Sequence, residues 1–172
     1  PAEAAERFQY KHYYRIDFVL EESGLPAVIY ARTIPRAWQG EEQINQRASL
    51  DGLFLKFGEQ FLFAADRIAW HPDGADKQLG VHADHLLLGE LGMDVGLFDQ
   101  VVQKRRLLGA DRECFYQLLA AVERADHAEL IQRGRRNSRF APLLENPVAQ
   151  QGRLVTLSGT ARRAVKIPVT DR

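Results

Sequence analysis

The stretch over residues 13–38 constrains the fold more than any other part of the chain, because it has the pattern of a β-hairpin. Every second residue from 14 to 20 is apolar and charged side chains stand between them, which is typical of a half-buried strand over residues 13–20. A polar turn follows, and residues 26–33 are rich in β-branched and aromatic side chains until Pro35 ends the run. The pattern predicts two antiparallel strands.

Three further segments have strand character. Residues 48–57 are largely apolar around Gly52, which predicts a third strand with a bend or bulge at the glycine. Residues 61–70 predict a fourth strand, closed by a Pro-Asp-Gly turn. Residues 154–169 are typical of one long strand bulged at Gly159, or of two short strands.

Between the fourth and the last predicted strand the apolar periodicity becomes helical. Helices are predicted over residues 81–91, 94–102, 111–125 and 127–133. The third of these has the clearest signal, because it begins at an aspartate suited to an N-cap and carries a stripe of apolar residues at i, i+3, i+4 and i+7. Residues 134–151 are polar, rich in arginine and contain two prolines, which indicates a linker.

This order of segments predicts an α+β fold of one domain. Five strands with a helical insertion before the last one suggest a strongly bent, OB-like antiparallel β-barrel, with glycines at its corners. The single domain, residues 1–172, would contain four strands in residues 1–70 and a helical insertion in 71–133. A linker over 134–151 would lead to residues 152–172, as the closing strand or the start of a following domain.

Composition places the chain among soluble globular proteins, with 45% hydrophobic and 27% charged residues. The single cysteine excludes an internal disulfide, and no apolar run approaches the roughly 18 residues that a membrane-spanning helix needs. The net charge of zero hides an asymmetry, since residues 1–100 hold 9 Lys and Arg against 16 Asp and Glu, and residues 101–172 hold 14 against 7. Such an asymmetry can steer a partner or hold the halves together.

The ends indicate a piece of a larger protein, because the chain begins at Pro1 rather than Met and stops at Arg172 just after strand-like residues. We expect the parent to contain other domains. A membrane-anchored or exported parent is compatible with this soluble domain, and the sequence assigns no cellular compartment.

Four runs of the chain resemble segments of large, uncharacterised planctomycete-type proteins that contain repeated OB-like domains and membrane anchors. The runs are Tyr13–Asp17, Ile34–Trp38, Gly92–Asp99 and Gly159–Ala164. The resemblance implies an OB-like domain within a longer chain. It implies no known activity and supplies no catalytic residue.

Histidines and carboxylates gather after the fourth predicted strand. The candidate metal ligands are His71, Asp73, His82 and His85. The last two are three residues apart and would share a helix face, and imidazole with carboxylate suits zinc or another transition metal, with Glu90 as the general base of a metal-dependent enzyme. Because the spacing matches no established metal motif, and a polar surface loop with solvated histidines has the same composition, no cofactor is expected.

Basic residues in the second half favour an alternative function, the binding of single-stranded nucleic acid, as OB-type barrels do with a cationic face and aromatic platforms. The candidate contacts are Arg133, Arg135, Arg136, Arg139, Arg162 and Arg163. The candidate platforms are Tyr10, Tyr13, Tyr30, Trp38 and Trp70. Against this stand the neutral net charge and the acidic first half, and arginines near helix ends also complement the helix dipole.

No motif establishes a catalytic site. Cys114 lies near the start of the predicted helix over 111–125, where a thiol could become a nucleophile, although a lone cysteine on such a helix more often packs in the core. The sequence therefore favours a structural or protein-interaction module excised from a larger protein. Its partner would be another domain of the parent or a second copy, bound at a sheet edge or by the strand-like C-terminus.

Overall fold

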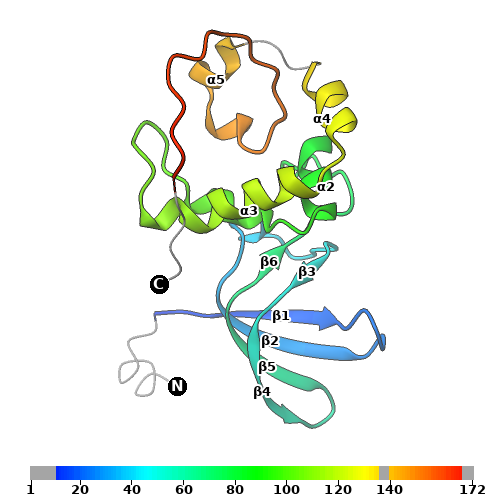
Figure 1. Ribbon diagram of the computed structural model, residues 1–172. Coiled ribbons are helices and arrows are strands. Elements are labelled where there is room, and N and C mark those ends of the chain that lie inside the picture. The colour runs from blue at the N-terminus through cyan, green and yellow to red at the C-terminus, as the bar shows by residue number, and fades with distance from the viewer. Residues whose placement is uncertain (1–10, 136–139, 168–172) are drawn as a thin grey trace.

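The computed structural model describes residues 11–135 and 140–167, which form a mixed α+β fold with the strands at one end and the helices at the other (Figure 1). The strands are β1 (Tyr14–Val19), β2 (Pro26–Thr33), β3 (Ala48–Ser49), β4 (Gly52–Phe57), β5 (Phe61–Arg67) and β6 (Ala69–Trp70). The α-helices are α2 (Ala83–Glu90), α3 (Arg112–Arg124), α4 (His127–Gly134) and α5 (Ala141–Glu145). Short 3-10 helices are η1 (Arg36–Trp38), η2 (Val95–Gln100), η3 (Gly109–Asp111) and η5 (Val148–Gln150).

The main sheet has four strands in the order β1-β2-β5-β4. The first hairpin is antiparallel, as predicted, and its register places Ile16 opposite Ile29. In contrast, β2 and β5 are parallel, with Ile29 opposite Phe63. β4 then pairs with β5 antiparallel, so β1 and β4 are the two edges. β3 and β6 form a separate two-stranded sheet nearer the helices.

The predicted antiparallel barrel is wrong, because the sheet is mixed and open. The predicted third strand divides at residues 50–51 into β3 and β4, and the fourth divides at Ile68 into β5 and β6. The bulge lies between Phe54 and Lys56 rather than at Gly52.

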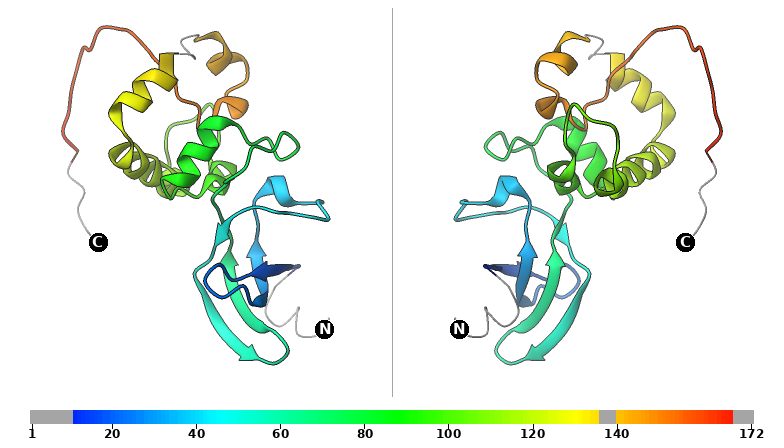
Figure 2. Two further views of the ribbon diagram at one scale, coloured as in Figure 1. Left: turned by 90° about the vertical axis from the view of Figure 1, so that its right-hand side faces the viewer. Right: turned by 90° about the vertical axis from the view of Figure 1, so that its left-hand side faces the viewer.

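The predicted closing strand over 154–169 is also wrong for residues 154–167, the described part of that range, because these residues form no strand. The start of that segment contacts the helices instead. The Leu154 amide donates to Asp84 of α2, and a Cβ at Gly134 of α4 would lie 3.0 Å from the Thr156 hydroxyl. Because these residues lie against the helical part, they are not placed to close the sheet (Figure 2).

Most of the predicted helices are confirmed. The segments 81–91, 111–125 and 127–133 correspond to α2, α3 and α4. The segment predicted over 94–102 forms the 3-10 helix η2, and the predicted linker over 134–151 contains α5 and η5. None of the described helices is long and apolar enough to cross a membrane.

One apolar core joins the main sheet to the helices. Trp38 and Trp70 meet edge to face with ring centroids 5.8 Å apart, and both are buried. Residues of η2 and α3 pack against the same cluster, which also includes Ile29, Met93, Leu97, Cys114 and Ala121. The core therefore lies at the helical end of the sheet, and the far end of the β4–β5 hairpin projects away from it (Figure 1).

Candidate functional site

The hairpin of β4 and β5 gathers four phenylalanines on one face. We call Phe54, Phe57, Phe61 and Phe63 the phenylalanine cluster. The register pairs Phe54 with Phe63 and Phe57 with Phe61, and the extra residue of the bulge lets two residues three apart in β4 share a face. Ring centroids lie 5.6 Å apart in the first pair and 4.6 Å apart in the second.

The strand β4 is exposed along its whole length, and we refer to Gly52–Phe57 as the β4 edge. Leu53 is 79% exposed, Leu55 67% and Phe57 65%. Among the described residues no strand pairs with its outer side. Its outward backbone groups are therefore free to pair with another strand.

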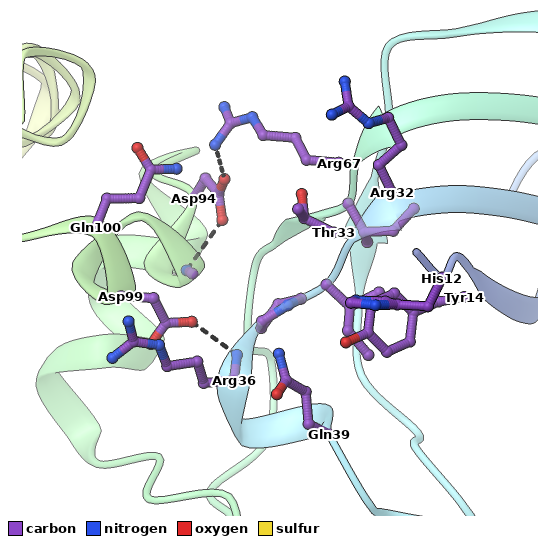
Figure 3. Close-up of a pocket in the computed structure, with 14 residues that line it drawn as sticks. His12, Tyr14, Arg32, Thr33, Arg36, Gln39, Arg67, Asp94, Asp99 and Gln100 are labelled. Carbon is purple, nitrogen blue, oxygen red and sulfur yellow. Dashed lines mark hydrogen bonds and ion pairs between the residues drawn. The ribbon is translucent and has the colours of Figure 1, made fainter. Parts of the chain in front are cut away.

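A polar pocket of about 300 Å³ lies where the ends of β2 and β5 meet η2 (Figure 3). Three arginines line it, and Arg67 forms an ion pair of 2.7 Å with Asp94. Arg32 pairs with Asp66 at 3.2 Å. The backbone amide of Arg36 donates to Asp99 at 2.7 Å.

Asp94 is the central acceptor of this pocket. Its buried carboxylate accepts hydrogen bonds from the Trp70 amide at 2.8 Å and the Gly96 amide at 3.0 Å, besides the Arg67 guanidinium. Burial raises the pKa of Asp94, and these donors oppose the rise. The hydrogen bonds and the ion pair of Asp94 thus connect the strands to η2, and most of the charged side chains that line the pocket are already paired.

A second, larger pocket of about 620 Å³ lies between β1 and the loop after η1. Apolar side chains of β1, η1 and this loop line part of it, among them Ile16, Phe18, Trp38 and Ile44. The strand pairing puts Ile16 and Phe18 on the sheet face that also carries the phenylalanine cluster. One face of the sheet is therefore apolar from β1 to β4 and only partly covered.

The candidate metal ligands do not form a site among the described residues, where no group of three His, Cys, Asp or Glu side chains could hold an ion. Both ring nitrogens of His71 have internal partners, the Met93 carbonyl at 2.9 Å and the Ser49 hydroxyl at 2.8 Å. Asp73 is exposed. Only His82 and His85 come together, with ring centroids 3.5 Å apart.

The two stacked histidines instead hold the chain near Gly152. Nδ1 of His82 accepts the His85 amide hydrogen and thereby caps α2. Nε2 of His85 lies 3.0 Å from the Gln151 carbonyl. Burial, with the charges of His85 and Arg153, lowers the pKa of His82 to about 4, and burial also lowers the pKa of His85.

The candidate nucleic-acid residues are scattered. Arg133 pairs with Glu129 at 2.6 Å and donates to the Ala83 carbonyl, whereas Arg135 is exposed at the end of α4. Arg162 and Arg163 lie in the exposed C-terminal segment. Arg136, Arg139 and Tyr10 lie outside the described residues.

The tryptophans predicted as stacking platforms, Trp38 and Trp70, are buried in the core, so that prediction is wrong for both. Tyr13 is exposed and packs edge to face on the half-buried Tyr30, with ring centroids 5.6 Å apart. Cys114 is buried as well, and burial beside Asp94 and Asp111 raises its thiol pKa to about 11. A helix N-terminus therefore does not activate this thiol.

No family model matches this chain, and no curated protein or solved structure matches it either. The resemblance to planctomycete-type proteins stays a prediction.

The exposed β4 edge, with the phenylalanine cluster, is the feature of the structure that folding alone explains least. The sequence did contain a signal for it, because residues 53–57 are apolar at four of five positions and lack the polar alternation of a half-buried strand.

Proposed function

We propose that this domain is a protein-interaction module that binds a partner strand along the β4 edge. The observation that carries the proposal is an edge strand with all six residues exposed, four of them large and apolar. Soluble proteins usually protect edge strands with charges, prolines or covering segments. Lys56 is the only charged residue within β4.

The energies are compatible with such a role. Covering a Leu or Phe side chain contributes about 1.5–3 kcal/mol, so the four in β4 would contribute roughly 6–12 kcal/mol. Association costs about 4–15 kcal/mol in lost translational and rotational freedom. Because the two figures are similar, the backbone hydrogen bonds of an added strand would decide whether the complex is stable.

The alternative of single-stranded nucleic acid has less support. Arg133 already has two partners within the chain, and the two tryptophans are unavailable for stacking. The alternative of a metal-dependent enzyme has the least support, since the histidine pair lacks a third ligand among the described residues.

The test uses a second copy of the domain as the partner. Light scattering after size exclusion, over a range of protein concentrations, should give a mass that rises from 19.5 kDa towards twice that value. A double variant, Leu53→Lys with Leu55→Lys, places charges on the β4 edge and should remain monomeric. These side chains are exposed, so the variant should fold normally.

Val19→Lys is the matched control, because Val19 is an equally exposed apolar residue on the opposite edge strand, β1. It should associate as the wild type does. A wild type that stays monomeric at every concentration, or an edge variant that associates normally, would contradict the proposal.

A further inference from the structure

The C-terminal segment, residues 158–167, has the properties of a strand without a sheet. All its residues are exposed, and it forms no hydrogen bond with the other described residues. Val165 is 63% exposed and Ile167 81%, and residues two apart in a strand share a face. The segment leaves the helical part on its outer side and does not approach β4 (Figures 1 and 2).

The segment and the β4 edge are complementary in charge. Residues 158–167 contain Arg162, Arg163 and Lys166 and no acidic residue, a net charge of +3. Residues 51–67, which include β4 and β5, contain Asp51, Glu59 and Asp66 against Lys56 and Arg67, a net charge of −1. Asp51 and Glu59 flank β4 at its two ends and form no ion pair with described residues. The basic residues of an added strand would meet them there.

The length and the composition of residues 158–167 also suit pairing with the β4 edge. An extended segment of 10 residues spans at most about 33–36 Å, more than the six residues of β4 require. The segment provides backbone donors and acceptors throughout, since it contains no proline. Because Val165 and Ile167 would share a face, they would cover exposed apolar side chains on one face of the β4 edge.

We propose that the strand bound at the β4 edge is the C-terminal segment of a second copy of this chain, donated reciprocally so that two copies close into a dimer. This inference rests on the proposed function, because it names the partner strand for the same edge. Exchange of an identical element satisfies both edges of a pair at once and prevents open-ended growth.

Cysteine cross-linking between two differently tagged proteins tests the exchange. One protein has Leu53→Cys and the other has Val165→Cys, and the native Cys114 is buried and does not compete. A short bis-maleimide should join the two proteins into a mixed dimer. Val19→Cys, on the opposite edge, should give no such product with Val165→Cys.

A separate arm distinguishes this inference from the proposed function. The double variant Val165→Asp with Ile167→Asp should lose association in the light-scattering assay, as the edge variant does. If it associates normally while the edge variant stays monomeric, another strand binds the edge and the inference is overturned alone. Cross-linking of Leu53→Cys proteins to each other, without the mixed product, would indicate edge-to-edge pairing and also overturn it. A monomeric wild type would overturn both.

Discussion

At the scale of residues, the histidine pair makes stability depend on pH. The pKa of His82 falls from 6.5 to about 4 on folding, so the unfolded chain binds more protons between these values. We expect the free energy of unfolding to decrease by roughly 1–2 kcal/mol as the pH falls from about 6.5 to 4, after the shift of a half-buried ring is discounted for screening. Urea titrations at several pH values measure this.

The variant His82→Asn is the control for that experiment, since asparagine can cap α2 but does not titrate. Its stability should change less over the same pH range. An equal loss in both proteins would assign the pH dependence to other groups.

Asp94 provides a second prediction for single residues. Asp94→Asn removes the charge and the carboxylate oxygen that accepts from Arg67, while the amide oxygen can still accept from Trp70 and Gly96. We therefore expect a loss of about 1.5–3 kcal/mol in the free energy of unfolding. Asp66→Asn removes an exposed aspartate from Arg32 and should cost no more than about 1 kcal/mol. Equal losses in thermal or urea unfolding would show that the buried network around Asp94 is not the stronger of the two.

At the scale of elements, Gly152 holds the chain after η5 against α2. Its φ is +71°, and a Cβ there would lie 2.8 Å from the Phe98 ring and 2.9 Å from the His85 ring. We expect Gly152→Ala to cost about 1–3 kcal/mol, through left-handed backbone strain and overpacking. Gly159→Ala, in open space, should be nearly neutral in the same unfolding measurement. A neutral Gly152→Ala would contradict this role.

The strands β1 and β2 could be predicted from sequence because their signal is local, a polar-apolar alternation and a turn. The parallel pairing of β2 with β5 could not be predicted, because the paired residues are 34 positions apart in the sequence, as Ala27 opposite Phe61 shows. The phenylalanine cluster was missed for a related reason. The bulge in β4 shifts the alternation by one residue, so the face of Phe57 cannot be counted from Phe54.

At the scale of the whole molecule, the predicted barrel fails because residues 154–156 lie against the helices and residues 158–167 do not reach the sheet, which leaves β1 and β4 as open edges among the described residues. The same observation is the basis of the proposed function. The strand-like pattern of residues 154–169 was recognised from sequence, but the sequence alone does not identify the sheet, or the copy of the chain, that it would join. The predicted metal ligands do not come together among the described residues. Both ring nitrogens of His71, for example, already contact Met93 and Ser49.

If the β4 edge binds another strand, amide hydrogen exchange detects the new backbone hydrogen bonds. Exchange is compared between dilute and concentrated wild-type protein. We predict that the amides of Gly52–Phe57 that point away from β5 become protected as concentration rises, while those of β1 do not change. Unchanged exchange in β4, or new protection in β1 alone, would contradict strand binding at the β4 edge.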